Sequence, residues 1–368
     1  MPDNSSRRQW LKTTATVLTG ISIAPSLFAT EREKYRASGI ILLNSNENAY
    51  GPSPMAKKAI LDAYSTSNRY PDDYIPALKK RIASQWKVGA ENILLGAGSS
   101  EIIGLSAIHV SAGKGHIIVG DPAYKVWNGQ AESFGLSINR ISLNQNRVHD
   151  LDKMLSSITR ETGMIYICNP NNPTGTINNA DELRNFAKEA ALKTFVFIDE
   201  AYTEYAGLPS LADLAVSNKN ILVAKTFSKI YGLAGARTGY AIAHPDTINS
   251  LSKYQPWPDA AISVVSAVAA MASLDDTSFV QSCKDNAAKA REICSSAFTH
   301  LKLDYIPSQT NFILFNIDKI KGDFIAQMQA RNIYVQFREH FGGKWCRVSM
   351  GTIEEIQEFA KALKEIAS

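Results

Sequence analysis

Seven short runs of apolar residues recur along the chain, and this pattern constrains its fold more than any other feature. Most of the runs are nearly continuous rather than alternating, which is typical of strands covered on both faces. Helical stretches, for instance 102–109 and 181–187, separate several of them. We therefore predict an α/β fold with a mostly parallel seven-stranded sheet, whose strands are centred near Ile93, Ile117, Ile138, Ile165, Val196, Leu222 and Tyr240.

The pattern changes in the last hundred residues, which predict a smaller α+β unit. A long helix from Phe279 precedes a strand at 311–315, a helix near Phe324, and strands at Ile333 and Cys346 that are separated by a polar loop at 338–344. The final helix, 353–366, is amphipathic. We predict a large domain at 61–275 and a small domain at 276–368, with residues 30–60 packing against the small domain. The cleft between the two domains is the predicted substrate site.

Lys229 follows the apolar run 221–224 and is flanked by Ser228 on one side and by a Gly-rich turn that leads to Arg237 on the other. A lysine at the end of a buried strand can hold an aldehyde cofactor as a Schiff base while a hydroxyl and an arginine bind its phosphate. Taken alone, Lys229 would be better interpreted as a solvated lysine at a strand end, since most lysines are solvated.

Two further polar groups follow neighbouring apolar runs. Asp199 ends the run 195–198, where a carboxylate can pair with a protonated pyridine nitrogen, although capping the next helix is an equally good interpretation. Asn172 lies in the stiff turn 169–175 and can present its amide to a ligand oxygen.

Two more groups follow earlier runs. Residues 96–101 form a Gly-rich bend before a helix, so Ser99 and Ser100 can bind a phosphate through their backbone N–H groups. This bend has neither the dinucleotide-binding nor the P-loop pattern. Tyr124 follows the run 116–119 and either stacks on a flat cofactor or packs as an ordinary tyrosine. Ligand-type groups thus follow five separate strands, which chance does not explain.

These residues resemble those of a known family. The set Asn172-Pro173-Thr174-Gly175, Asp199-Glu200-Ala201-Tyr202, Ser228-Lys229 and Arg237 is similar to the class I/II aminotransferases of pyridoxal-phosphate fold type I. Within this group, the closest similarity is to the histidinol-phosphate aminotransferase branch, through Asn46-Glu47-Asn48-Ala49-Tyr50-Gly51, Arg69-Tyr70-Pro71 and Arg347-Val348-Ser349-Met350-Gly351-Thr352. The resemblance runs from Ile40 to the C-terminus.

The resemblance implies a role for each matching residue. Lys229 would form the Schiff base with pyridoxal 5′-phosphate and move the proton during catalysis, and Asp199 would pair with the pyridine nitrogen. Asn172 and Tyr202 would bind the ring oxygen, and Tyr124 would stack on the ring. Arg347, with Tyr50 beside it, would bind the anionic group of the substrate. The phosphate would be held by Ser99, Ser100, Ser228, Arg237 and, from the neighbouring subunit of a homodimer, Tyr70.

The chain departs from this branch at Gln336, where the histidinol-phosphate enzymes typically carry an arginine. Glutamine cannot offer a charge-assisted fork to a substrate phosphate, whereas Arg338 lies two residues further on, on the same face of an extended strand. We therefore expect an amino acid donor and a 2-oxo acid acceptor rather than histidinol phosphate. Three alternatives stay open: a decarboxylase of the threonine-phosphate type, a non-catalytic cofactor-binding protein, and a lyase or oxidase on the same scaffold.

The N-terminus resembles a twin-arginine export signal. The motif Arg7-Arg8-Gln9-Trp10-Leu11 precedes a mildly apolar segment that is too short and too rich in Thr and Ser for a permanent membrane anchor. We expect a signal peptide at 1–29 and a periplasmic protein exported after folding, or a cytoplasmic protein if this interpretation fails.

The remaining composition is ordinary. The formal net charge is +4, and no basic cluster interleaved with aromatic residues suggests nucleic-acid binding. The six histidines show no metal-ligand spacing, so we expect no metal site, and only His340, in the polar loop ahead of Arg347, is a candidate for a role in the substrate site. We predict that the four cysteines are free thiols, because Cys283 and Cys294 share one helix about 16 Å apart.

Overall fold

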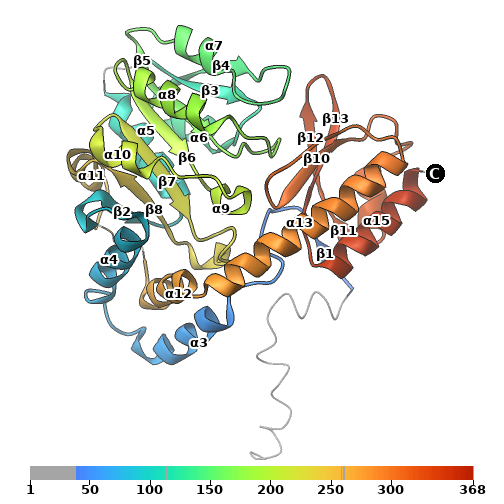
Figure 1. Cartoon of the computed structure of the whole chain (residues 1–368), viewed down its shortest axis with the longest axis horizontal. Coiled ribbons are helices and arrows are strands. Elements are labelled where there is room, and N and C mark those ends of the chain that lie inside the picture. The colour runs from blue at the N-terminus through green and yellow to red at the C-terminus, as the bar shows by residue number, and fades with distance from the viewer. Residues whose placement is uncertain (1–38, 113–114, 258, 260–261, 368) are drawn as a thin grey trace, which may run out of the picture.

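The computed structural model describes residues 39–112, 115–257, 259 and 262–367. It has a large unit built around a wide sheet and a smaller unit beside it, and one long helix, α13 (Thr277–His300), runs from one to the other (Figure 1). The proposed signal peptide, 1–29, lies outside the described residues. Within the described residues, no helix is both long and apolar enough to cross a membrane.

The large sheet has seven strands in the order β2-β8-β7-β6-β5-β3-β4, and all seven predicted strands are confirmed. Neighbouring strands are parallel except at β8, which is antiparallel to both β2 and β7. The strands are β2 (Ile93–Gly96), β3 (His116–Asp121), β4 (Ser137–Ser142), β5 (Thr162–Cys168), β6 (Phe195–Asp199), β7 (Ile221–Thr226) and β8 (Gly239–Ala243).

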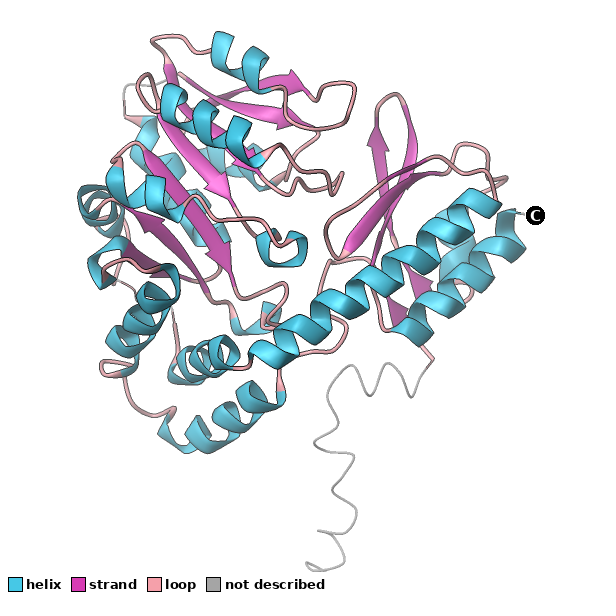
Figure 2. Cartoon of the chain, in the orientation of Figure 1, coloured by secondary structure: helices cyan, strands magenta, loops and turns pink. Residues whose placement is uncertain are grey.

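Alternate residues of the central strands enter two separate hydrophobic cores, one on each face of the sheet. Along β6, Val196 and Ile198 belong to one core, whereas Phe195 and Phe197 belong to the other. Helices cover both faces (Figure 2). The first core is closed mainly by α3 (Pro54–Ala63), α4 (Tyr74–Trp86), α7 (Leu151–Ser156), α8 (Ala180–Ala190), α10 (Ala212–Ser217) and α12 (Val264–Asp275). The second is closed by α5 (Ser99–Ser111), α6 (Val126–Ser133) and α11 (Pro245–Ser252).

The small unit contains a four-stranded antiparallel sheet in the order β12-β13-β10-β9. Its strands are β9 (Tyr305–Ile306), β10 (Phe312–Asn316), β12 (Gln336–His340) and β13 (Gly343–Ser349), and its helices are α14 (Phe324–Gln329) and α15 (Ile353–Ala367). The N-terminal segment contacts this unit, because β1 (Ile41–Leu42) pairs in parallel with β11 (Ile333–Tyr334).

The prediction of a polar loop at 338–344 is wrong, because this segment belongs to a β-hairpin. Strand β12 continues to His340 and returns as β13 through Phe341 and Gly342, which have φ values of 55° and 74°. Polar residues hide this strand because β12 has no buried position: its residues alternate between half-buried and exposed, so both faces are free to be polar.

Helix α13 contributes to both units. Cys283 and Ala287 pack in a core of the large sheet, whereas Ala290 and Cys294 pack in the core of the small unit. The predicted boundary at 275/276 therefore marks the start of this helix, and the cores change within it. All four cysteines are buried and free, which confirms the prediction of free thiols.

Candidate active site

The five predicted ligand groups converge on one cavity of about 170 Å³ at the edge of the large sheet. The cavity lies where β3, β5, β6 and β7 end and where α5 begins, since the carboxyl ends of parallel strands meet at the same edge. Its wall includes Ser99, Ser100, Tyr124, Asn172, Asp199, Tyr202, Ser228, Lys229 and Arg237.

Asp199 lies at the end of β6 and is almost fully buried. Its Oδ2 accepts a hydrogen bond of 2.8 Å from the Tyr166 hydroxyl, and its Oδ1 accepts one of 3.1 Å from the Ala201 N–H. Asp199 does not cap a helix, because the next helix, α9 (Thr203–Ala206), has Tyr202 at its N-cap. Burial raises the pKa of Asp199 and so favours its neutral form. A cationic partner in the cavity would oppose this effect and favour the ionised carboxylate.

The start of α5 and Arg237 line the same cavity and together form a cradle. Gly98, at φ 79°, is the N-cap of α5, and the first N–H groups of a helix have no acceptor within it and suit an anion. The Arg237 guanidinium is within 3.4 Å of Ser228 Oγ and donates to the carbonyls of Ala234 and Ala97. The backbone at Gly239 lies tightly against that of Gly98 and Ser99, because a Cβ on Gly239 would lie 2.5 Å from the Gly98 carbonyl carbon and from the Ser99 nitrogen.

Lys229 reaches into the same cavity from the segment after β7. Its Nζ lies 5.6 Å from the centre of the Tyr202 ring. Burial and the positive charges of Arg347 and Arg237 lower the pKa of Lys229 to about 8, while Glu47 and Asp199 oppose this shift. A lysine with this pKa has a substantial neutral fraction near pH 7.5, and only the neutral amine is nucleophilic.

Asn172 and Tyr202 link the cofactor cavity to the small unit. The Tyr202 hydroxyl accepts from Asn46 Nδ2 at 3.1 Å and from Asn172 Nδ2 at 3.5 Å. Asn172 Oδ1 accepts from Arg347 Nη1 at 2.7 Å, and Arg347 Nη2 donates to the Asn44 carbonyl. The amide of Asn172 therefore contacts groups on both sides of the cleft.

Arg347 lines a second cavity of about 450 Å³ that adjoins the first. Tyr124, Asn172, Tyr202 and Lys229 belong to the walls of both, so a molecule in the second cavity would reach the lysine. Arg338, predicted to bind substrate, also lines the second cavity. Both arginines that the sequence singled out for substrate binding therefore line this cavity, and their roles stay predictions.

The structure does not bring Tyr50 or Tyr70 to either cavity of this chain. Tyr50 lies near Ile353, at the start of α15. The side chain of Tyr70 is 75% exposed and stacks on Trp257, with ring centres 5.7 Å apart. The predicted role of Tyr50 beside Arg347 stays a prediction. The predicted role of Tyr70 in phosphate binding requires a neighbouring subunit and also stays a prediction.

Several residues that shape the site were not assigned roles from the sequence. Tyr166 binds Asp199 from the neighbouring strand β5 and looked like one more apolar strand residue. Asn46 is held by Ser349, whose hydroxyl accepts from the Asn46 N–H at 2.8 Å, and by Asn311, which donates to the Asn46 carbonyl. Asn46 and Ser349 lie inside the family motifs, which was the only signal available for them.

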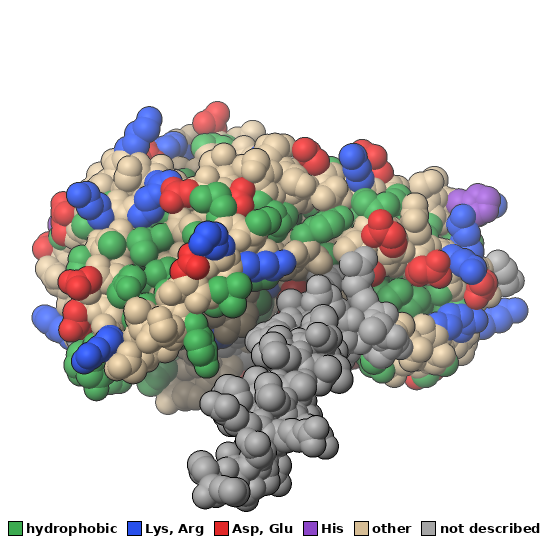
Figure 3. Space-filling view, turned by 90° about the horizontal axis from the view of Figure 1, so that it is seen from below, with side chains coloured by type: hydrophobic (Ala, Val, Ile, Leu, Met, Phe, Trp, Pro, Cys, Tyr) green, Lys and Arg blue, Asp and Glu red, His purple; other side chains and the backbone are tan. Residues whose placement is uncertain are grey.

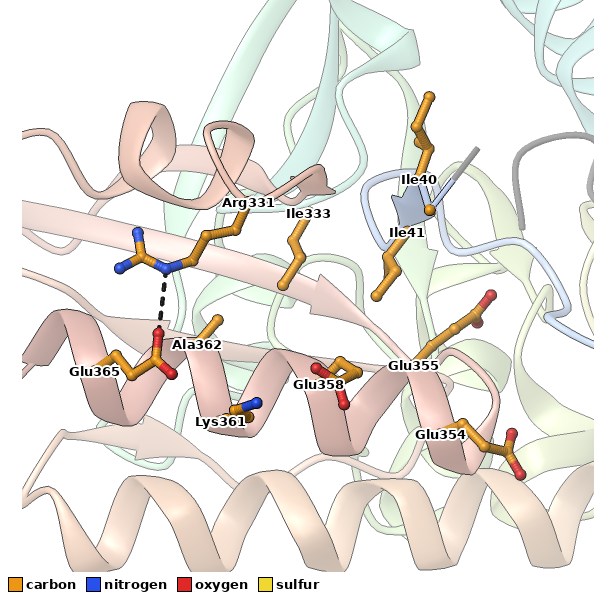
Figure 4. Close-up of a pocket in the computed structure, with 11 residues that line it drawn as sticks. Ile40, Ile41, Arg331, Ile333, Glu354, Glu355, Glu358, Lys361, Ala362 and Glu365 are labelled. Carbon is orange, nitrogen blue, oxygen red and sulfur yellow. Dashed lines mark hydrogen bonds and ion pairs between the residues drawn. The ribbon is translucent and has the colours of Figure 1, made fainter. Parts of the chain in front are cut away.

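A different hollow, of about 460 Å³, lies in the small unit between β1, β11 and α15 (Figure 4). Ile41 and Ile333 point toward its interior, and the Arg331–Glu365 ion pair, 3.4 Å long, lies at one end. Its wall contains no residue of the two cavities described above. Within the described residues, no group of three or more His, Cys, Asp or Glu side chains is placed to hold a metal ion.

Comparisons with known proteins agree with this geometry. The family model for aminotransferase class I and II matches residues 38–363, so the chain belongs to this family. It is 34% identical to histidinol-phosphate aminotransferase from Moorella thermoacetica, over 89% of this chain and 85% of that protein. It is 36% identical to histidinol-phosphate aminotransferase from Caldicellulosiruptor saccharolyticus, over 89% of this chain and 92% of that protein. The crystal structure of the Sinorhizobium meliloti histidinol-phosphate aminotransferase in complex with pyridoxal-5′-phosphate superposes with a TM-score of 0.80 at 26% identity, covering 92% and 95% of the two chains.

The chain is therefore a pyridoxal-phosphate-dependent transaminase with the fold type I architecture predicted from its sequence. The comparisons favour transamination over the decarboxylase and the non-catalytic alternatives. The described residues fit the cofactor: the first cavity has a lysine, a buried carboxylate, a partly buried tyrosine, and a tight cradle formed by a helix N-terminus and an arginine.

We expect Lys229→Ala to abolish covalent attachment of the cofactor, because Lys229 is the only lysine among the residues that line the first cavity. Borohydride reduction followed by mass spectrometry would detect the trapped adduct in the wild type and in the exposed control Lys253→Ala. A trapped adduct in Lys229→Ala would contradict the assignment.

We expect Gly239→Ala to weaken cofactor binding by roughly tenfold or more, because relieving the backbone clash at Gly98 and Ser99 costs about 1–3 kcal/mol. Gly235→Ala is the matched control, since an added Cβ there meets no atom within 4 Å. Absorbance titration of the two apoproteins would compare them, and equal affinities would show that the cradle does not hold the phosphate.

Proposed function

We propose that the enzyme transfers the amino group of an α-amino acid to a 2-oxo acid, with the cofactor in the first cavity and the substrate in the second. The proposal rests chiefly on one observation: Arg347 and Lys229 line the same cavity, and Asn172 contacts both Arg347 and Tyr202. An anion bound by Arg347 would place the rest of a small substrate beside the lysine.

In this proposal each residue has a defined task. Arg347 binds the substrate carboxylate through its planar fork, and its attachment to Asn172 fixes the direction of that fork. The neutral Lys229 amine takes the proton from the substrate carbon that bears the nitrogen, and the ammonium form returns a proton later. Asp199, held by Tyr166, keeps the pyridine nitrogen protonated. Pyridoxal phosphate supplies the electron sink that makes this proton removable.

Gln336 supports an amino acid donor over histidinol phosphate. Gln336 lies directly opposite Arg347 in the β12–β13 register, so the position beside the arginine is neutral. A neutral amide adds hydrogen bonds but no charge, which suits one carboxylate at Arg347 better than a doubly charged phosphate.

We expect Arg347→Ala to lower kcat/KM for amino acids while the cofactor stays bound. The decrease should correspond to a loss of about 2–5 kcal/mol in transition-state stabilisation. Arg347→Lys is the informative companion, because it keeps the charge and loses the fork. Rates of cofactor-band bleaching for a panel of amino acids and histidinol phosphate would test the substrate assignment. Histidinol phosphate reacting far faster than every amino acid would overturn it.

We also propose a homodimer. Large hydrophobic side chains are exposed on α3 and the segments near it, including Leu61 (76%), Tyr64 (73%), Tyr70 (75%) and Trp257 (59%). Figure 3 views the molecule from the side on which α3 lies and shows hydrophobic side chains among charged ones on this face. Covering such a surface with a second copy would remove it from water.

We expect sedimentation to show a dimer that Leu61→Lys weakens. Leu192→Lys is the matched control, since Leu192 is 81% exposed after α8, away from α3. An active wild-type monomer at assay concentration would contradict the proposal that Tyr70 of a neighbouring subunit completes the phosphate site.

We propose that residues 1–29 direct export of the folded enzyme to the periplasm, on the basis of the twin-arginine motif. We expect the double variant Arg7→Lys, Arg8→Lys to accumulate, folded and with cofactor, in the cytoplasm, as cell fractionation would show. A wild-type protein found only in the cytoplasmic fraction would refute this proposal.

A further inference from the structure

His149, on the segment between β4 and α7, is almost fully buried and lines neither of the two active-site cavities. Its Nε2 lies 3.0 Å from the carbonyl oxygen of Cys168, the last residue of β5. A Cβ on Gly120, in β3, would lie only 2.3 Å from its Nδ1. The imidazole therefore packs against the ends of the two neighbouring strands that lead to Asn172 and Tyr124.

These contacts define which nitrogen of the ring carries the hydrogen. The Cys168 carbonyl can only accept, so Nε2 of His149 donates to it. Burial lowers the pKa of His149 to about 4, so the ring is neutral near neutral pH and its Nδ1 is an acceptor. Nδ1 has no hydrogen-bond partner within the described residues. An unpaired buried acceptor is destabilising, and an apolar side chain would avoid it, which singles out the donation from Nε2 as the contribution of this histidine.

A second contact joins His149 to the far end of the same turn. The Asn178 side chain donates from Nδ2 to the His149 carbonyl at 2.9 Å. The Asn178 N–H donates to Oδ1 of Asn169 at 2.9 Å. His149 is thus bonded to the residue before the turn, Cys168, and to the residue that closes it. Both ends of the segment that carries Asn172 are fixed to one buried residue.

The middle of this turn faces the active site and the small unit. Asn172 Oδ1 accepts from Arg347 Nη1 at 2.7 Å, and Nδ2 lies 3.5 Å from the Tyr202 hydroxyl. The Gly175 carbonyl accepts from the Gln309 N–H at 2.8 Å. Nδ2 of Asn172 carries two hydrogens, so it can also donate to the ring oxygen of the cofactor. A shift of the turn would change the direction of this amide relative to the cofactor and to Arg347.

We propose that His149 is a positioning residue for Asn172. The ring N–H and the carbonyl of His149 hold the two ends of the turn 169–178, and the turn aims the Asn172 amide at the cofactor ring oxygen on one side and at Arg347 on the other. The inference relies on the predicted hydrogen bond from Asn172 to the ring oxygen. It goes beyond the proposed function, because His149 contacts neither cavity and its role requires no particular substrate.

The first test is a pH titration of the visible absorbance of the cofactor bound to Lys229, with no substrate present. A hydrogen bond from Asn172 stabilises negative charge on the ring oxygen and so weakens its attraction for the proton on the Schiff-base nitrogen. Losing this bond should move the midpoint to higher pH. We expect Asn172→Ala to give the full shift and His149→Leu to give a shift of the same sign, of about half a pH unit or more.

Two further variants show whether the hydrogen bond from the ring is responsible. His149→Gln can donate from near the position of Nε2 and should restore most of the wild-type midpoint. His116→Leu is the matched control, because His116 Nε2 bonds Thr162 Oγ1 at 2.9 Å at the opposite end of β3, and it should leave the midpoint unchanged. An unchanged midpoint in folded His149→Leu would overturn the inference.

A double-mutant cycle separates positioning from a general structural role. If His149 acts through Asn172, His149→Leu should lower the half-reaction rate about tenfold in the wild type but should add nothing to the effects of Asn172→Ala. Additive effects on the midpoint and on the rate would refute the inference. If His149→Leu does not fold, Asn178→Ala removes only the bond to the His149 carbonyl and should give a smaller shift of the same sign. An unchanged midpoint in that variant would then count against the inference.

The titration also keeps this inference separate from the proposed function. An enzyme that reacts with none of the amino acids tested would contradict the proposed function, whereas the midpoints of the His149 and Asn172 variants would still decide whether His149 positions the amide.

Discussion

The burial of both faces of the large sheet is the constraint from which the active site follows. Central strands such as β6 and β7 have no exposed face, so a functional side chain has no place along them and must lie where a strand ends. Because β3, β5, β6 and β7 are parallel, their carboxyl ends reach the same edge. The antiparallel β8 brings Gly239 to this edge at its N-terminal end, against the start of α5.

The exception to this rule shows how costly a polar group inside the sheet is. Lys225 lies within β7 and is almost fully buried. It is accommodated by two carboxylates and by the face of Trp86, 4.5 Å from its Nζ. Glu200, one of the two carboxylates, directly follows Asp199 and also accepts from the Leu211 N–H. The ion pair therefore ties the turn after Asp199 to the next strand, which would help keep the buried Asp199 carboxylate in place.

The sequence predicted the large sheet and grouped the residues that line the first cavity, because both depend on local signals. A continuous apolar run followed by a polar residue identifies a buried strand and its functional end without knowledge of the rest of the chain. The hairpin of β12 and β13 was recognised only in part. The strand at Cys346 was predicted, but β12 was not, because the pairing of Gln336 with Arg347 depends on the turn between the strands and not on an apolar run. Tyr166 was missed for a related reason: its hydroxyl matters only because strand register puts β5 beside β6 and so brings it to Asp199.

In the proposed function, the position of Arg347 makes substrate binding depend on how the two units are held together. Its guanidinium comes from the small unit and bonds Asn172 in the large one, so a small rotation between the units would move the anion site relative to Lys229. Helix α13 opposes such a rotation, because its two halves are buried in different cores. A second contact lies at the hairpin turn, where the Arg147 guanidinium sits 3.7 Å from the centre of the Phe341 ring. The hairpin that carries Arg338 and His340 is thus held against the large unit at its tip as well as at its base.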